Sequence, residues 1–470
     1  MTRAGYLPAL DGLRALSVLA VIGFHAELPR LGGGFLGVEV FFVVSGYLIT
    51  SLLLLEWQNG GTISLPQFWL RRARRLLPAV FALLLAALTA SLTLAPDSLA
   101  QTRSDAAAAL LYFSNWWQVF EHHSYFMAVE RPPLLQHLWS LAVEEQFYLI
   151  WPLIVVLLAG TARRWLGLVA LLGASGSALW MAHLFDPASD PTRVYVGSDT
   201  RMSGLLLGAA LAASLTAPTP HATSVSRVAQ TVRETLALAG LATLCWAFVH
   251  FDSHAPFLYR GGLVLVDLAS CALLTGLLAP TSIARLLGAA PFAWLGRRSY
   301  GLYLWHWPIF ALTRPDFDVA LGGLPLLALR LALTVLVSEL CYQLIETPVR
   351  RGQLGVLLRT RPLVFGTSAV LLVSPAASLI FLSSTRLAVA RSAALGSSRK
   401  ASDASAVAVA KQPAVDDPRP MSVPRAISGI PFDPAWPKTL TLLSDSVGLA
   451  LGKALPAALP GWKVEVLGRP

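Results

Sequence analysis

The chain alternates between long apolar runs and short polar segments, and eleven of the runs approach or reach the length of a membrane span. A helix crosses the hydrocarbon core of a bilayer with about 20 apolar residues. The pattern therefore predicts an all-α polytopic membrane protein with about ten helices plus one extra helix. The runs cover residues 8–28, 35–55, 76–95, 139–159, 165–184, 202–216, 236–252, 261–280, 300–313, 325–345 and 363–383.

The character of the sequence changes after the eleventh run. Residues 385–437 are rich in Ala, Ser and Pro, which predicts an extended linker. Thr439 then opens an apolar strand that ends in a polar turn, followed by a helix from Gly448 and a strand from Lys463. This order is typical of the start of an α/β unit, but about thirty residues are too few to close a domain. The predicted parts are a membrane domain (1–350), an extra transmembrane helix (351–384), the linker (385–437) and the N-terminal fragment of a further domain (438–470).

Composition supports a membrane protein, with 55% hydrophobic residues, 13% charged residues and a mean hydropathy of +0.61. The net charge of +10 would also suit a nucleic-acid partner, but the arginines fall mainly in short loops. With the N-terminus inside, fifteen of them lie in cytoplasmic loops and six in external loops. The bias predicts a cytoplasmic N-terminus, an extracytoplasmic C-terminal tail, a lipid bilayer as the environment and no nucleic-acid partner. The three cysteines have no ligand-type spacing, so we expect no metal site.

Arg14 and His25 lie in the first apolar run with no charged residue between them. Eleven residues at ~100° each make three turns plus ~20°, so both side chains leave the same helix face, ~16 Å apart. Arg14 could merely reach the interface, and His25 could merely bond a neighbouring helix. The functional alternative is that Arg14 binds an anionic group from the cytoplasm while His25, near the outer end, is a general base.

Two further pairs suggest chemistry. Arg72 and Arg75 are neighbours on one helix face, and paired guanidinium groups suit phosphates, although arginines at a membrane edge also serve topology. Glu144 and Glu145 lie inside an apolar run, where carboxylates usually face a cavity or an arginine. A structural ion pair is the alternative interpretation. Weaker candidates, which we assign to substrate binding, are Ser45, Tyr148, Arg201, Tyr303 and His306. His306 stays open between a structural and a functional role, and Glu346 is expected only to end the tenth helix.

Five motifs occur in an order that resembles the membrane acyltransferase-3 family, over roughly residues 6–350. They are Asp11-GLRALSVLAVIGFH, Phe41-FVVSGYLI, Phe68-WLRRARRLLPA, His137-LWSLAVEEQFYLIWP and Ser299-YGLYLWHWP. The resemblance implies transfer of an acyl group, commonly acetyl from cytoplasmic acetyl-CoA, to an extracytoplasmic glycan or an antibiotic. It also implies that His25 is catalytic, that Arg14, Arg72 and Arg75 bind coenzyme A, and that Glu144 and Glu145 are functional carboxylates.

The tail resembles the family's subgroup with a fused SGNH-type domain, which includes peptidoglycan and lipopolysaccharide O-acetyltransferases. Within Leu443-SDSVG, Ser446 matches the nucleophile of that domain's Gly-Asp-Ser block, with Ser444 in place of the glycine. A serine nucleophile needs a base and an oxyanion hole, and no Asp-x-x-His block follows in this sequence. We expect the start of an SGNH-type domain here, in truncated form.

These observations predict an O-acyltransferase of the bacterial cytoplasmic membrane that acetylates an extracytoplasmic glycan. Direct transfer and a covalent relay through Ser446 both stay open. A transporter is the alternative from another class, because intramembrane charges also mark substrate pathways. Transporters commonly carry internal repeats, and none is evident. An inactive assembly partner is the third possibility.

Overall fold

The computed structural model describes residues 6–121, 124–125, 131–159, 163–215, 226–315, 317–352, 439–443 and 463–467. The chain divides into two compact units, Met1–Ser397 and Ser398–Pro470. The first unit is helical throughout its regular elements, and the second contains two strands. Each unit is considered by itself.

Eight helical segments of the described chain are long and apolar enough to cross a membrane. They contain α1 (Pro8–His25), α2 (Gly37–Gly60), α3 (Leu65–Thr93), α6 (Trp139–Ala159), α7 (Arg163–Leu184), α10 (Arg227–His250), α11 (Leu263–Leu277) and α15 (Gly323–Cys341). The short runs 202–216 and 300–313 fall in α9 (Ser198–Leu215) and α14 (Ser299–Ala311). Ten predicted helices are thus confirmed, whereas the eleventh run (363–383) and the linker (385–437) lie outside the described residues.

Short helical elements fill the connections, and hydropathy did not predict them. They are α4 (Leu99–Leu110), α5 (Ser114–Phe120), α8 (Thr192–Val196), α12 (Ser282–Leu287), α13 (Ala290–Arg297) and α16 (Thr347–Arg350), with the 3₁₀ turns η1 (Gly34–Leu36), η2 (Pro96–Ser98) and η3 (Gln136–Leu138) and the π-turns η4 (Leu258–Gly262) and η5 (Tyr342–Glu346). η1, η3 and η4 lead directly into membrane helices, and η5 follows α15. The helices of the spans are therefore longer than their α-helical parts.

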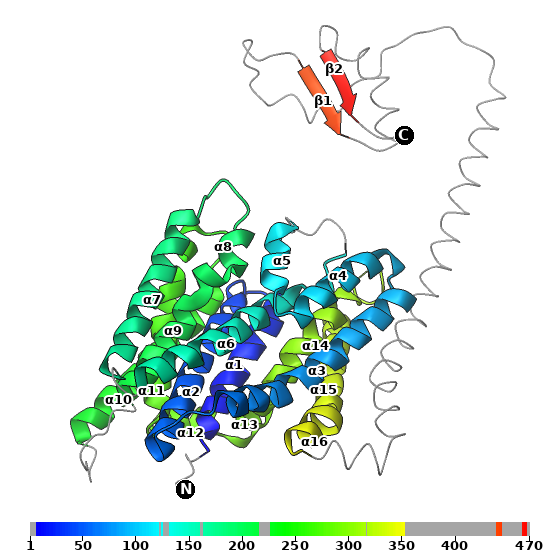
Figure 1. Cartoon of the computed structure of the whole chain (residues 1–470). Coiled ribbons are helices and arrows are strands. Elements are labelled where there is room, and N and C mark those ends of the chain that lie inside the picture. Colours follow the sequence, from blue (N-terminus) through cyan, green and yellow to red (C-terminus); the bar gives the residue numbers. More distant parts are fainter. Residues whose placement is uncertain are drawn as a thin grey trace, which may run out of the picture. The chain divides into compact units, whose positions relative to one another are not determined.

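α1 has a central position in the membrane unit (Figure 1). α2, α7, α9, α10 and α11 form one group, in which α2 packs on α9 and α10 packs on α11, while α3, α14 and α15 form a second group. α1 contacts both groups, because it packs on α2 and also on α14. Its buried Leu13 belongs to one hydrophobic cluster and its buried Val18 to the other. Residues on α1 can therefore meet residues from either group.

Glycine allows α2 and α9 to approach closely. A Cβ atom on Gly46 would lie 1.8 Å from the Leu205 carbonyl oxygen, and one on Gly208 would lie 2.1 Å from the Val43 carbonyl oxygen. Small residues at such crossings permit backbone contact between membrane helices. The outer surfaces carry exposed apolar side chains such as Leu157 and Leu179, as expected for helices surrounded by lipid.

The second unit contains the two strands predicted from the sequence. β1 (Thr439–Leu443) pairs in parallel with β2 (Lys463–Leu467), with Thr439 opposite Lys463. Parallel neighbours need a crossover connection, which agrees with the predicted order of strand, helix and strand. The helix predicted from Gly448 and the predicted nucleophile Ser446 both lie outside the described residues, so the assignment to an SGNH-type domain stays a prediction.

Candidate active site

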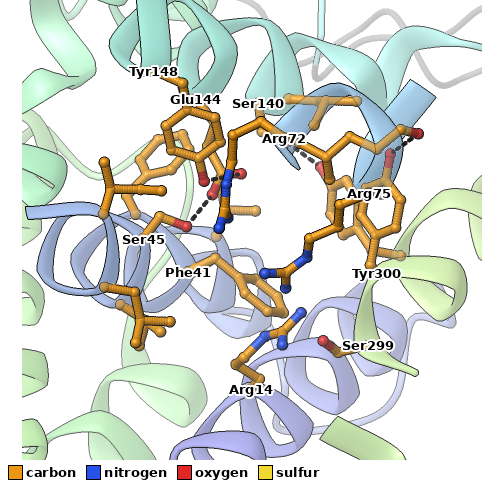
Figure 2. A pocket seen from close by; sticks show the side chains of 18 of the residues that line it. Arg14, Phe41, Ser45, Arg72, Arg75, Ser140, Glu144, Tyr148, Ser299 and Tyr300 are labelled. Atoms are coloured by element: carbon orange, nitrogen blue, oxygen red, sulfur yellow. Dashed lines mark hydrogen bonds between the residues drawn. The ribbon is translucent and has the colours of Figure 1, made fainter. Parts of the chain in front are cut away.

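Most of the residues singled out in the sequence line one narrow pocket, about 90 Å³ in volume, between α1, α2, α3, α6 and α14 (Figure 2). Five helices from distant parts of the chain supply its wall. The predicted residues that line it are Arg14, Ser45, Arg72, Arg75, Glu144, Tyr148 and Tyr303. The structure thus brings Arg14 of the first helix together with the predicted pair Arg72 and Arg75. It adds Glu144, one of the two predicted carboxylates.

The Glu144 carboxylate is held from two sides. The Ser45 hydroxyl donates to its Oε1 atom over 2.9 Å, and the Tyr148 hydroxyl donates to Oε2 over 3.4 Å. Because Ser45 is on α2 and Glu144 is on α6, the first bond ties two helices together at the pocket wall (Figure 2). A carboxylate with bonded oxygens is fixed in orientation, which suits it to position a neighbouring group.

Three guanidinium groups point into the pocket from α1 and α3 (Figure 2). Arg14 lies 3.6 Å from Asp11, one turn earlier in α1. Arg72 lies over the Phe68 ring at 5.8 Å, and its buried Nε atom has no hydrogen-bond partner among the described residues. With Arg75 and the single carboxylate Glu144, the wall carries more positive than negative charge. Buried guanidinium groups in excess of carboxylates favour an anionic ligand.

A second pocket of about 500 Å³ adjoins the first and shares part of its wall, including Arg14 and Arg75. It adds the side chains of Arg297, Arg350 and Glu346. From the sequence, Glu346 was predicted only to end the tenth helix. Instead the carboxylate faces this pocket, and its buried Oε1 atom has no hydrogen-bond partner among the described residues.

His25, at the last position of α1, lines a third pocket of about 470 Å³. Arg14 lines the first two pockets and His25 the third, so the two residues serve different cavities along one helix. The ring of Trp307 lies 4.7 Å from the His25 ring and lines the same pocket. Trp307 was not among the residues singled out from the sequence.

His306 lies between the pocket of His25 and that of Arg14. Its Nε2 atom is 3.0 Å from Nδ1 of His25, and its Nδ1 atom is 2.6 Å from the backbone carbonyl oxygen of Tyr303. The Tyr303 hydroxyl in turn hydrogen-bonds Ser140 over 2.6 Å and donates to the His137 carbonyl over 2.9 Å. These are two separate sets of contacts: the His306 ring reaches the Tyr303 backbone, whereas the Tyr303 side chain lines the arginine pocket and its hydroxyl bonds Ser140 and His137.

His137 is a further buried histidine, and it was not among the candidate residues predicted from the sequence. Its ring centroid is 5.8 Å from that of His306, and its Nε2 atom is 3.0 Å from the Leu304 carbonyl oxygen. The available signal was the spacing of His137, in η3, and Glu144, in α6, since seven residues along a helix bring both to one side. Ser140, between them, carried no signal beyond its place in the motif.

Two predicted residues lie elsewhere. Glu145 does not line any of these three pockets, and its buried Oε1 atom has no hydrogen-bond partner among the described residues. Arg201 is buried in an ion pair with Glu39 of α2 and lies within 4.8 Å of the Tyr195 ring centroid. It also lines none of the three pockets. The predicted roles of both residues, and that of Ser446, stay predictions.

Most of the chain is similar in sequence to known proteins. The sequence model of an acyltransferase domain family matches residues 7–343. The chain belongs to this acyltransferase family. The match covers α1 to α15 and so includes the linings of the first and third pockets, and that of the second except for Tyr6, Glu346 and Arg350. It confirms the family named by the resemblance of the five motifs.

Relatives of the acyltransferase include two named O-acetyltransferases. The chain is 42% identical over 353 residues to the peptidoglycan O-acetyltransferase OatA of Listeria monocytogenes, covering 74% of this chain and 56% of the relative. It is 38% identical over 354 residues to the O-acetyltransferase OatA of Staphylococcus aureus, covering 74% and 57%. The chain thus matches little more than half the length of these relatives. No solved structure matches it. The described residues contain no group of three or more His, Cys, Asp and Glu that could hold a metal ion.

Proposed function

We propose that this chain is an integral membrane O-acyltransferase that moves an acetyl group from cytoplasmic acetyl-CoA to a hydroxyl of peptidoglycan. One observation carries the proposal: α1 lines both a pocket with three arginines and a separate pocket with His25, whose ring hydrogen-bonds the buried His306. The names of the relatives supply the acceptor class. The excess of arginines in loops on the N-terminal side supplies the orientation.

The arginine pockets suit the donor. Acetyl-CoA carries phosphates at one end and a thioester at the other. Arg14, Arg72 and Arg75 would bind the phosphates by charge-assisted hydrogen bonds, and the unpartnered Nε atom of Arg72 is one donor available for this purpose. From Arg14 the helical rise of ~1.5 Å per residue leaves ~16 Å to His25. An extended donor would place its thioester near the histidine pair.

The third pocket suits the acceptor. A sugar needs an aromatic or apolar face for its ring and polar groups for its hydroxyls. Trp307 and Phe310 provide the first, and Gln136, Arg314 and the His25 ring provide the second. Because His25 lines this pocket, a hydroxyl bound there would lie near the base.

The reaction is then an acyl transfer with one base. Nε2 of His25 takes the proton of the acceptor hydroxyl as its oxygen attacks the thioester carbonyl. The new C–O bond forms and the C–S bond breaks, and the coenzyme A thiolate leaves with the proton that His25 gives back. The products are an acetate ester and coenzyme A. If Ser446 is the first acceptor, the same step acetylates its hydroxyl, and a second transfer delivers the acetyl group to the glycan.

Labelled acetyl-CoA tests the proposal in inverted membrane vesicles loaded with lysozyme-digested peptidoglycan. We expect label in the fragments with the native chain and a loss of at least about 100-fold in His25→Ala, the lower end of what a general base contributes. His250→Ala is the matched control, because His250 is exposed at the end of α10 and should transfer normally.

Other outcomes separate direct transfer from the relay or contradict the proposal. Label that stays on the protein would favour the relay through Ser446. Uptake of intact acetyl-CoA without ester formation would favour a transporter. No transfer at all by a folded, inserted chain would favour an inactive partner, and unchanged transfer by His25→Ala would exclude His25 as the catalyst.

A further inference from the structure

His306 has only one tautomer that satisfies its contacts. Its Nδ1 atom lies 2.6 Å from the Tyr303 carbonyl oxygen, and a carbonyl can only accept a hydrogen bond. Nδ1 therefore carries the proton. The side chain is completely buried, and neither hydrogen bond given to its ring reaches a carboxylate. Because an unpaired charge is costly to bury, the ring rests in its neutral form.

The tautomer of His306 acts on that of His25, whose ring also makes a hydrogen bond to the Val21 backbone. A neutral imidazole with a proton on Nδ1 offers a lone pair at Nε2, and this atom faces Nδ1 of His25 over 3.0 Å. Two lone pairs would repel, so Nδ1 of His25 must carry the proton and donate it. The Nε2 atom of His25 is then left with its lone pair free.

We propose that His306 is a positioning residue that fixes His25 in the tautomer with a basic Nε2 atom. The inference rests on the proposed acyl transfer and assigns His306 a role different from the substrate binding expected from the sequence. When Nε2 of His25 takes the hydroxyl proton, the ring becomes an imidazolium. Its Nδ1–H group then donates more strongly to the His306 lone pair, which stabilises the positive charge until the proton passes to the coenzyme A thiolate.

Two neutral amides separate this role from a purely structural one. In His306→Gln, the amide reaches the place of the Nε2 atom, and its oxygen can accept from His25. In His306→Asn, the shorter amide reaches the place of Nδ1 and can still donate to the Tyr303 carbonyl, but it offers nothing to His25. We expect kcat within about 10-fold of the native value for the glutamine variant. For the asparagine variant we expect a loss of about 100-fold or more, the upper end for removing a hydrogen-bond partner of a reactive histidine, with the KM for acetyl-CoA within about threefold of native in both.

The measurement uses the full chain purified in detergent, radiolabelled acetyl-CoA and lysozyme-digested peptidoglycan, with activity divided by the amount of monodisperse protein. If His306→Asn does not fold, His306→Met replaces it, because methionine fills a similar volume and accepts only weakly. Equal activity of the two variants, or a raised KM in both, overturns the inference. If the native chain transfers no acetyl group, the proposed function itself fails, and the two failures are thereby distinguished.

Discussion

The buried ion pair between Arg201 and Glu39 gives a prediction that separates structural from functional arginines. Both side chains are only 1% exposed, and the Arg201 guanidinium also lies within 4.8 to 5.7 Å of three aromatic ring centroids. The carboxyl groups of Glu39 and of Asp267, on α11, lie close together: a Cβ atom on Gly204 would lie 3.0 Å from the first and 2.7 Å from the second. The group therefore joins α2, α9 and α11. Removing the cation leaves a carboxylate buried without its partner.

The size of the effect follows from burial. Breaking a buried pair from one side costs about 3–5 kcal/mol, so Arg201→Met should reduce the free energy of unfolding by that amount. The double variant Arg201→Met with Glu39→Gln should recover more than half of the loss, because the Glu39 charge that lost its partner is removed as well. Arg193 pairs with Asp199 over 2.7 Å, but these side chains are 36% and 32% exposed. Arg193→Met should therefore cost only about 0–1 kcal/mol, which makes it the matched control.

Unfolding by SDS in mixed micelles, followed through the intrinsic fluorescence of the 14 tryptophans, measures these differences. If Arg201→Met unfolds like Arg193→Met, or if the double variant is no better than the single, the reasoning from burial is wrong. The kinetics of the folded Arg201→Met protein then test the substrate-binding role that the sequence predicted for Arg201. We expect an unchanged KM for peptidoglycan fragments, whereas a raised KM with native stability would support Arg201 as a substrate-binding residue.

Three further predictions concern the donor pocket, helix packing and pH. Arg75→Gln should raise the KM for acetyl-CoA about 10- to 100-fold, which corresponds to about 1.5–3 kcal/mol for a lost charged hydrogen bond. Arg71 is exposed and lies outside the pocket, so Arg71→Gln should leave this KM unchanged. Equal KM values for the two variants would exclude Arg75 from donor binding. Gly46→Ala should destabilise the chain by about 1–3 kcal/mol or more in the SDS titration, because its Cβ atom would meet backbone of α9, and Gly60→Ala, with open space around it, should not. Burial raises the pKa of Asp105, in α4, to about 6. The folded chain therefore binds more protons than the unfolded chain between pH 3.8 and 6, and it loses stability as the pH rises through this interval. At pH 7.5 the Asp105→Asn variant should be more stable than the native chain by up to about 3 kcal/mol, and a stability difference that does not shrink on acidification would contradict this.

The helices of the membrane unit were predictable because the hydrocarbon core of a bilayer offers no hydrogen-bond partners to the backbone. Backbone groups in lipid must bond within a helix, so apolar runs of spanning length leave little choice. Even the short runs 202–216 and 300–313 proved to be helical. The short connecting helices were not predictable, since their lengths and polarity resemble those of ordinary loops. Helix pairing was equally hidden, because the close approach of α2 and α9 depends on single glycines such as Gly46.

The site was predictable where several signals coincided. Arg14, Arg72, Arg75 and Glu144 stood out because charges in apolar runs are rare, and they line one pocket. Adjacent residues were harder to separate, because a helix turns ~100° per residue and Glu145 therefore leaves α6 in a different direction from Glu144. Arg201 looked identical to a binding residue in the sequence. Only the fold brings Glu39 beside it.

The arrangement along α1 also limits where the chemistry can occur. The hydrocarbon core is about 30 Å thick, whereas Arg14 and His25 are separated by ~16 Å of helical rise. In the proposed function, a donor held by its phosphates at Arg14 would therefore reach the histidine pair without moving its charged end through the bilayer. The acetyl group would cross as part of the bound donor, and only a neutral ester would have to form at the far pocket. Such an arrangement would avoid the transfer of a free, charged acyl species through lipid, so a polytopic membrane fold would suit the proposed transfer between opposite sides.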